Sequence, residues 1–387
     1  MPWKETRVVD ERMRFIAAVL EDPRGNFALL CRRFGVSRAN GYKWVARYKE
    51  FGPDGLRDHP PVAREHPNRL ADAVVDRVVQ LRKDRPHDGP KKLRVLLLER
   101  EPSLAVPSAS TIGEILDRHG LIRPRRVRLR VPPSSNPLAH AELPNDVWCT
   151  DFKGDFLLGD RTRCHPLTLT DAVARYLLKC EGLMRQTDVV VRPHFERAFR
   201  EFGLPLRMRS DNGPPFASKA IGGLSRLSVW WIQLGITPER IEPGKPQQNG
   251  RHERMHLTLK QQTASPPEET MADQQRAMDR FRHDYNDVRP HEALGQTPPA
   301  RHYEPSPRLM PDKPRDPEYG GDVEVRRVRP DGFVSWRGVL LKLTPLLAAQ
   351  PVGFKAVDQD EWELWYGPVL LGHVLLRDGK PKLDPLR

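Results

Sequence analysis

The chain has 387 residues, enough for two to four domains with cores of their own. Its formal net charge is +13, and residues 1–140 carry 28 Lys and Arg against 17 Asp and Glu, whereas residues 141–387 carry 36 against 34. No run approaches the ~20 apolar residues of a transmembrane helix and no signal peptide opens the sequence, so we expect a nucleic acid partner and neither a membrane partner nor secretion. The four cysteines are widely spaced and form no Cys-x-x-Cys pair, which argues against a disulfide framework and against a structural zinc site.

The first 50 residues are expected to form three short helices. Asn26 can cap the second helix and Ser37 can cap the third, which covers residues 38–48. The third helix carries four side chains suited to contacts with DNA, namely Arg38, Asn40, Lys43 and Arg47. This layout predicts a helix-turn-helix domain over residues 1–58 with its last helix in a major groove, although any small three-helix bundle shows the same pattern.

A second helical domain is predicted over residues 68–121. Apolar residues recur at helical spacing over 71–84 and 90–100, and a Ser-rich start leads into a third helix that stops at Gly120. Two such domains in tandem would read an extended DNA site.

A basic linker follows over residues 122–140. It contains five arginines and no acidic residue: Arg123, Arg125, Arg126, Arg128 and Arg130. Two interpretations stay open, a solvated linker or an arm that contacts phosphates or the minor groove.

Three acidic residues stand out in the second half of the chain. Asp151 lies in the middle of an apolar, β-favouring run over residues 147–156, where burial of an unpaired carboxylate would be costly. Asp211 directly follows a predicted strand and opens an Asp-Asn-Gly turn, which exposes its carboxylate at a sheet end. Glu253 lies on a predicted helix, seven residues before Lys260 and therefore on the same helical face.

These acids have ordinary explanations when each is taken alone. Asp-Asn-Gly is commonly a turn, and Glu253 could be a solvated helix residue. Two unpaired carboxylates about 4 Å apart repel by about 4 kcal/mol at an effective dielectric constant near 20, so three would not gather without a cation. Mg²⁺ or Mn²⁺ suits carboxylate oxygens. The rival acids rank lower because none lies mid-strand in a motif with a matching partner; they are Asp155, Asp160 and Asp171.

An α/β core is expected around these acids, over residues 141–304. Strands are grouped first and helices follow. In chain order the expected elements after the Asp151 strand are strands at 162–170 and 174–180, a helix at 186–202, the strand before Asp211, a helix around Trp230 and Trp231, and a helix at 273–286.

The last part of the chain changes to the short period of β-strands. A Pro-rich linker over residues 305–317 precedes six short strands with turn signals between them, which predicts a small all-β barrel over residues 318–387. The six predicted strands are 322–327, 332–336, 339–343, 351–357, 361–366 and 369–376.

The acids and the motifs around them resemble the catalytic triad of transposases and integrases with a ribonuclease-H-like core. The resemblance is greatest to bacterial insertion-sequence transposases of the retroviral-integrase-like group, and it extends over most of the chain. It is carried by Ser-Asp-Asn-Gly-Pro-Pro-Phe (210–216), Lys-Pro-Gln-Gln-Asn-Gly-Arg-His-Glu-Arg (245–254) and Tyr-Asn-Asp-Val-Arg-Pro-His-Glu-Ala-Leu (285–294). It implies a multidomain protein with all-α helix-turn-helix units, an α/β ribonuclease-H-like core and a small all-β C-terminal barrel.

Two features depart from the pattern of the relatives. There are 59 residues between Asp151 and Asp211 and 41 between Asp211 and Glu253. The second interval is somewhat longer than is usual in the family, and we place the extra length in residues 222–229. The zinc-binding His/Cys module at the start of retroviral integrases is not seen in this sequence.

The resemblance implies a transposase that cuts element ends with water and joins the freed 3′-hydroxyl to target DNA. Asp151, Asp211 and Glu253 would be both catalytic residues and ligands of two Mg²⁺ (or Mn²⁺) ions, with Asp151 shared between them. Residues expected to contact DNA near the cut are Gln247, Gln248, Asn249 and Lys260. Double-stranded DNA, at least a dimer, and a cytoplasmic, nucleoid-associated place in a bacterium are also implied.

Two other functions stay open at this point. A catalytically silent helix-turn-helix DNA-binding regulator derived from a transposase would bind DNA without metal-dependent nicking. A nuclease that only hydrolyses would cut without joining. A strand-transfer assay with a labelled donor end separates all three.

Overall fold

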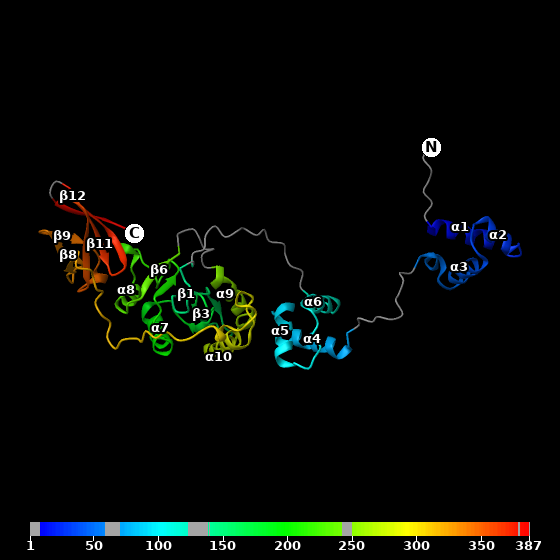
Figure 1. The fold of residues 1–387 in the computed structure, drawn as a ribbon, viewed down its shortest axis with the longest axis horizontal. Coiled ribbons are helices and arrows are strands. Elements are labelled where there is room, and N and C mark those ends of the chain that lie inside the picture. Colours follow the sequence, from blue (N-terminus) through cyan, green and yellow to red (C-terminus); the bar gives the residue numbers. More distant parts are fainter. Residues whose placement is uncertain are drawn as a thin grey trace. The chain divides into compact units, whose positions relative to one another are not determined.

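The computed structural model of the protein describes residues 8–58, 70–122, 138, 140–241, 250–377 and 380–386. The chain divides into two compact units, Met1–Leu70 and Ala71–Arg387, whose elements are labelled in Figure 1. Within these described ranges, no helix has both the length and the apolar character needed to cross a membrane.

The first unit is a bundle of three helices, as predicted. They are α1 (Val8–Glu21), α2 (Phe27–Arg33) and α3 (Arg38–Phe51). Both predicted caps are confirmed, because the Asn26 side chain accepts hydrogen bonds from the backbone at the start of α2 and the Ser37 hydroxyl accepts one at the start of α3. Gly41 has to be small, since a Cβ there would lie 2.8 Å from the Cys31 Sγ where α2 and α3 cross.

The second unit begins with another group of three helices. They are α4 (Asp72–Asp84), α5 (Pro90–Arg100) and α6 (Ala109–Arg118), close to the predicted bounds. Their core is made of aliphatic side chains that are at most 7% exposed: Val74, Val78, Leu81, Leu93, Leu96, Leu97, Ile112, Ile115 and Leu116.

A six-stranded mixed sheet follows. Its strands are β1 (Val147–Phe152), β2 (Phe156–Leu157), β3 (Arg163–Asp171), β4 (Leu177–Leu183), β5 (Arg207–Ser210) and β6 (Thr237–Arg240). β3 pairs antiparallel with β1, β2 and β4, whereas β1, β5 and β6 are parallel neighbours. An antiparallel meander that continues into parallel strands is the order expected of a ribonuclease-H-like fold.

The predicted strand over residues 147–156 is in fact two strands. β1 ends at Phe152, and Lys153, Gly154 and Asp155 separate it from β2. Asp151 is therefore the next-to-last residue of β1, and its prediction as a mid-strand residue was wrong. The break falls at Gly154, whose φ is +76, a signal that the prediction of one continuous strand overlooked.

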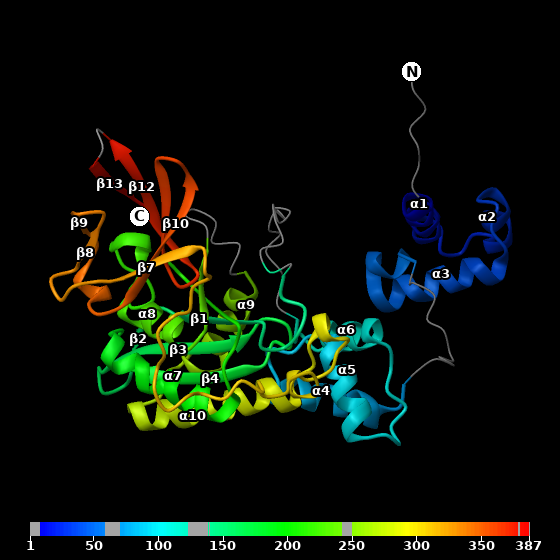
Figure 2. The same cartoon turned by 60° about the vertical axis from the view of Figure 1, so that its left-hand side comes forward.

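Helices cover both faces of this sheet (Figure 2). On one face, α7 (Asp188–Phe202) and α8 (Arg226–Gln233) share a core with strand residues such as Trp148 and Met208. On the other face, α9 (Gly250–Thr263) and α10 (Met271–His283) pack on Cys164 and Cys180. A π-helical turn, η4 (Asp284–Val288), extends α10.

The C-terminal part contains the six predicted strands and one more. They are β7 (Val323–Arg327), β8 (Phe333–Trp336), β9 (Val339–Lys342), β10 (Pro351–Asp358), β11 (Glu361–Tyr366), β12 (Val369–Arg377) and β13 (Lys380–Pro385). They form a five-stranded sheet in the order β13-β12-β11-β10-β7 and a separate β8-β9 hairpin. The strand pairs of the described residues leave β7 and β13 as edges, so closure into a barrel is not confirmed.

The C-terminal sheets share an apolar core with α8 and the residues just before it. Leu224, Val229 and Ile232 are buried in one cluster with Leu371. Gly222 has φ +60 and its N–H donates to the Leu386 carbonyl at 2.9 Å. Residues 222–229, where we expect the extra length of the interval before Glu253, thus overlap a segment on which the C-terminal sheets pack.

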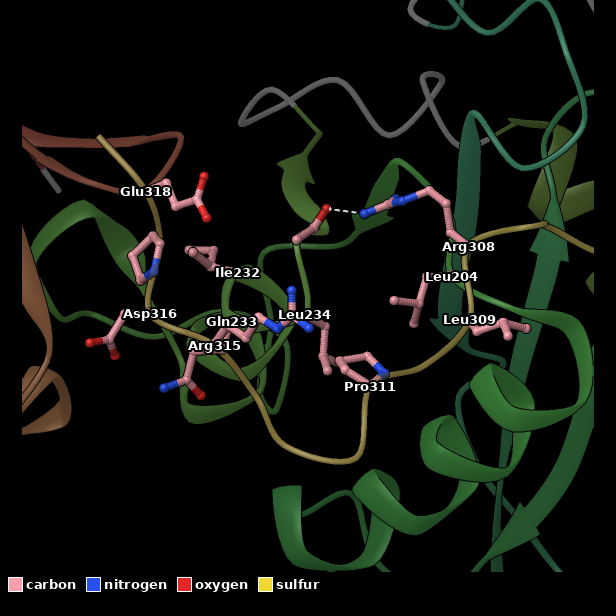
Figure 3. Close-up of a pocket in the computed structure, with 12 residues that line it drawn as sticks. Leu204, Ile232, Gln233, Leu234, Arg308, Leu309, Pro311, Arg315, Asp316 and Glu318 are labelled. Atoms are coloured by element: carbon pink, nitrogen blue, oxygen red, sulfur yellow. Dashed lines mark hydrogen bonds between the residues drawn. The ribbon is translucent and has the colours of Figure 1, made fainter. Parts of the chain in front are cut away.

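The Pro-rich segment 305–317, expected to be a linker, is hydrogen-bonded along the core. Ser306 N–H donates to the Phe202 carbonyl at 2.8 Å, and Leu204 N–H donates to the Arg308 carbonyl at 2.7 Å. Arg308 also reaches the Gly235 carbonyl at 2.7 Å, as Figure 3 shows. We call this segment, residues 305–317, the strap, because it is held against the core by these hydrogen bonds.

Candidate active site

The register of two parallel strands sets two of the predicted acids side by side. β1 pairs with β5 so that Val147 lies opposite Arg207 and Cys149 opposite Arg209. β5 ends at Ser210, and the same register continued by two residues would place Asp151 beside Asp211; the charge of Asp211 does act on Asp151. Because side chains two residues apart point to the same face, both carboxylates leave the carboxyl ends of their strands on one side.

The turn that carries Asp211 is fixed by its own motif. The Gly213 N–H donates to the Asp211 carboxylate at 3.3 Å, and the Asn212 side chain donates to the Ile241 carbonyl at 2.9 Å. Phe216 is buried, with its ring 5.7 Å from that of Phe152 on β1. The sequence Ser-Asp-Asn-Gly-Pro-Pro-Phe therefore ties the turn to the neighbouring strands.

The third acid, Glu253, lies in the first turn of α9 and is exposed. Lys260 is exposed on the same helix, as expected from the spacing of seven. The opposite side of α9 is buried against the sheet through His252, Met255, His256 and Leu259.

Two buried histidines of α9 meet one hydroxyl on β3. The Thr168 Oγ1 lies 2.7 Å from the Nε2 atoms of both His252 and His256, and it donates to the Asp151 carbonyl at 3.1 Å. A hydroxyl offers one donor and two acceptor positions, so this arrangement uses all three when both imidazoles carry the proton on Nε2. The contact joins the helix that carries Glu253 to the strand that carries Asp151.

Sequence reasoning missed these histidines as site residues. The buried positions 252, 255, 256 and 259 follow the helical i, i+3, i+4, i+7 pattern, which was a usable signal. Their partner Thr168 is 84 residues away from His252, so the contact itself could not be read from spacing.

The site carries more negative charge than its surroundings balance. Burial raises the pKa of Asp151 to about 7, and the charges of Asp211 and Glu253 add to the effect. Burial also raises the pKa of Asp211, against the hydrogen bond from Gly213. Burial lowers the pKa of His252 to about 3 and that of His256 to about 2, so both imidazoles stay neutral near pH 7. A cation would relieve this imbalance.

The donor chemistry of these acids suits a divalent ion. Among the residues that the structure describes, no three His, Cys, Asp or Glu side chains form a finished metal-binding cluster. Asp211 and Glu253 are both close enough for their charges to act on Asp151. Hard cations prefer such carboxylate oxygens and leave room for water and phosphate, so the residues present fit Mg²⁺ or Mn²⁺.

The rival acids have structural partners instead. Asp155 forms an ion pair with Arg163, and the Asp160 carboxylate accepts the Thr162 N–H at 2.8 Å. Asp171 is 1% exposed and accepts three backbone hydrogen bonds. These contacts agree with the lower rank of the three.

The residues expected to read DNA on α3 differ in exposure. Arg38, Asn40 and Lys43 are exposed. Arg47 is half-buried, lies 4.9 Å over the Trp44 ring and donates to a backbone carbonyl at 2.9 Å, so it stabilises the bundle. The exposed Tyr42, which sequence reasoning missed, adds an aromatic ring to this helix.

Other predicted DNA contacts lie outside the described residues. These are Arg123, Arg125, Arg126, Arg128 and Arg130 of the basic linker and Gln247, Gln248 and Asn249 before α9.

A cavity of about 420 Å³ lies under the strap (Figure 3). Its lining includes Leu204, Gln233, Arg308, Arg315 and Asp316. None of the three predicted catalytic acids lines it, so we do not connect it with the chemistry.

Profiles of known protein families match both the helical domains and the α/β core of this chain. Two profiles described as Integrase core domain match residues 141–246 and 234–299. A Helix-turn-helix domain matches residues 11–64, and a Homeodomain-like domain matches residues 40–116.

Two relatives are encoded by bacterial insertion elements. The IS407 uncharacterized 31.7 kDa protein of Burkholderia multivorans is 30% identical over 237 residues, which cover 60% of this chain and 82% of the relative. The IS476 uncharacterized 39.2 kDa protein of Xanthomonas euvesicatoria is 29% identical over 258 residues, or 66% of this chain and 70% of the relative.

Similar solved structures are more distant. A chain of the simian T-cell lymphotropic virus intasome is 15% identical, covers 80% of this chain and 95% of its own length, and has a TM-score of 0.38. The HTLV-2 integrase catalytic core domain in complex with magnesium is 18% identical, covers 42% of this chain and 98% of its own, and has a TM-score of 0.32. Family membership therefore rests on the sequence matches.

Proposed function

The chain belongs to the family of bacterial insertion-sequence transposases with helix-turn-helix and integrase core domains, and from this premise we propose that it is a metal-dependent DNA strand transferase. The observation that carries this proposal is the parallel register of β1 and β5, which supports a paired site at Asp151 and Asp211. Glu253 on α9 would complete the site.

We assign Asp151, Asp211 and Glu253 as the catalytic residues and as the ligands of two Mg²⁺ or Mn²⁺ ions, with Asp151 held in common. When bound, the ions would activate the attacking oxygen and stabilise the leaving oxygen of an in-line displacement. The raised pKa of Asp151 supports this assignment, because a carboxylate that is buried beside other acidic residues resists ionisation until a cation is present.

The reaction consists of two displacements at phosphorus. First, a water oxygen bonds to the phosphorus at the element end and the bond to the 3′ oxygen breaks, which frees a 3′-hydroxyl. That hydroxyl oxygen then bonds to a target phosphorus while the target's own 3′ oxygen leaves with a proton. Each step forms one P–O bond for each one broken, so neither a covalent protein intermediate nor an external energy source is needed.

Residues around the acids would position the helix and the DNA. Thr168, through His252 and His256, would hold α9 against the sheet so that Glu253 faces Asp151. Lys260, exposed on the same helix, would contact a phosphate near the cut, together with Gln247, Gln248 and Asn249.

The helical domains would bind the element ends. We propose that α3 presents Arg38, Asn40 and Lys43 to base edges and that the basic linker contacts phosphates. The proposed domain bounds are 1–58, 68–121, 122–140, 141–304 and 318–387, the last being a small β-domain. We also propose an assembly of at least two copies on DNA.

A strand-transfer assay with a labelled donor end tests this function. In Mg²⁺, the wild-type protein should cut the end and join it to target DNA, whereas Asp151→Asn, Asp211→Asn and Glu253→Gln should each lose about 10³-fold or more in joining and still bind the end. Binding without any cutting would indicate a regulator, and cutting without joining would indicate a nuclease. Near-normal joining by any of the three variants would overturn the residue assignment.

A further inference from the structure

One conspicuous motif has no part in the proposed chemistry. The stretch Tyr-Asn-Asp-Val-Arg-Pro-His-Glu-Ala-Leu over residues 285–294 contains no member of the acid triad, and it begins inside η4, the turn that extends α10. Its contacts fall into two groups, one directed to the sheet and one directed to the helical domain α4–α6.

The first group fixes the motif to the sheet. Asn286 is 2% exposed, and its side chain both accepts the Leu177 N–H at 2.8 Å and donates to the Leu177 carbonyl at 3.0 Å. Tyr285 is buried and packs its ring against His291 and Phe281. The Asn286 amide satisfies the backbone of β4 as a neighbouring strand would, so this end of the motif is held rigidly.

The second group joins the motif to α4–α6 through four alternating charges. Arg85 donates two hydrogen bonds to Asp284, at 2.8 and 2.9 Å, and its Nε lies 2.6 Å from the Asp88 carboxylate. Arg289 lies 2.9 Å from the other Asp88 oxygen. We name these four residues, Arg85, Asp88, Asp284 and Arg289, the Arg–Asp joint.

The centre of the joint is buried, and the ion pairs around it are exposed to solvent. Asp88 is 1% exposed and Arg289 is 6% exposed. Around them, Lys91 contacts Glu292 at 2.6 Å and Arg301 contacts Glu99 at 3.4 Å, and these side chains are exposed. A buried centre with a polar rim is the anatomy of a specific interface, and a buried charge that loses its partner is strongly destabilised.

We propose that the Arg–Asp joint seats the helical domain α4–α6 on the catalytic core of the same chain and thereby sets the distance between the recognised DNA sequence and the phosphate that is cut. This proposal rests on the proposed function, because it assumes that α4–α6 binds the element end. Buried, alternating charges suit this role because they have only one favourable alignment, whereas apolar surfaces can slide.

Chemical crosslinking tests, independently of activity, whether α4–α6 contacts the core of the same chain through the joint. A carbodiimide couples an amine to a carboxylate that it touches, so the full-length protein should yield a peptide in which Lys91 is bonded to Glu292. In a mixture of ¹⁴N- and ¹⁵N-labelled protein, that peptide should carry unmixed labels, which identifies a contact within one chain. The core pair Lys179 and Glu201, 2.5 Å apart, is the positive control. Mixed labels alone, or no Lys91 crosslink while the control pair reacts, would overturn the proposal.

The position of the cut tests whether the joint sets the distance between the recognised DNA sequence and the phosphate that is cut. On labelled donor ends, the wild-type protein should cut at one fixed distance from the recognised sequence, and a two-base-pair shift of that sequence should move the cut equally. Arg289→Ala should keep end binding, lower cutting at that phosphate by about 100-fold and spread the cuts over neighbouring phosphates, because misplacement of about 1 Å costs about that much. Arg276→Ala, which removes an exposed arginine of α10 outside the joint, should act like the wild type.

A conservative variant separates positioning from folding. Arg289→Lys keeps a positive charge beside Asp88 and should restore part of the correct cutting that Arg289→Ala loses. Equal behaviour of Arg289→Ala and Arg276→Ala, or loss of end binding together with cutting in Arg289→Ala, would contradict the proposal. If the wild type itself neither cuts nor joins in Mg²⁺, the proposed function fails, and the crosslinking result still decides whether the seat exists.

Discussion

The acids of the site are held in two different ways. Asp151 lies on β1 and Asp211 directly follows β5, and these two strands are parallel neighbours in the sheet. Glu253 comes from a helix that reaches the sheet through side chains, namely the polar contacts of His252 and His256 with Thr168 and the apolar packing of Met255 and Leu259. The strand acids therefore depend on the sheet itself, whereas the place of the helix acid depends on side-chain contacts.

The largest expected effect is a loss of folding stability with rising pH, caused by ionisation of the Asp151 carboxyl. The Asp151 carboxyl has a pKa of about 7 in the folded protein against 3.8 when unfolded, so the folded state holds an extra proton between these values. Stability from this group is present below pH 3.8 and is lost as the pH rises to about 7, an effect of at most about 4 kcal/mol.

Thermal unfolding of metal-free protein at pH 5 and pH 8 measures this cost. Asp151→Asn should be more stable than the wild type at pH 8, by more than it is at pH 5. Added Mg²⁺ should stabilise the wild type at pH 8 and leave the variant unchanged. A difference between the two proteins that does not vary with pH would remove the electrostatic account of the pair.

The helix side of the comparison is tested by the hydroxyl of Thr168. Thr168→Val keeps the shape and removes the donor and both acceptors, so α9 should lose its alignment and strand transfer should fall by about 100-fold in kcat, with end binding intact. Thr168→Ser keeps the hydroxyl and should retain activity within about threefold. If valine and serine behave alike, the polar contacts do not position Glu253.

A smaller effect is expected at Lys260, on the exposed side of α9. Loss of one phosphate contact should raise KM for the donor DNA by about tenfold, leave kcat almost unchanged and reduce the salt dependence of binding. Steady-state kinetics of Lys260→Ala at two salt concentrations, compared with Arg276→Ala, measures this. A fall in kcat instead would place Lys260 in the chemical step.

The smallest effect is expected for a rival acid. Asp155→Asn removes a carboxylate that pairs with Arg163 on a neighbouring strand, so strand transfer should change by less than about twofold. A large loss would mean that the site extends to the turn between β1 and β2.

Local features of the fold could be predicted from the sequence, because their causes lie within a few residues. The caps at Asn26 and Ser37 and the helices they begin are examples. β13 was missed because its sequence, Lys-Pro-Lys-Leu-Asp-Pro, lacks β-branched residues and is a strand only through its pairing with β12.

The acidic residues of the site could also be predicted from the sequence, whereas the contacts that hold them could not. The order of the acids and their motifs indicated Asp151, Asp211 and Glu253, and the register of β1 and β5 agrees with the first two as a pair. The roles of Thr168 and of the Arg–Asp joint depend on contacts between residues about 80 to 200 positions apart. Such contacts follow from packing of whole domains, and neither periodicity nor spacing reports them.

Calorimetric titration of Mg²⁺ into the full-length protein at pH 8 tests the shared metal site most directly. We expect saturable Mg²⁺ binding by the wild type and by Asp155→Asn, loss of that binding in Asp151→Asn, and weaker binding in Glu253→Gln. Unchanged Mg²⁺ binding by Asp151→Asn would contradict the claim that these three acids hold the catalytic metal.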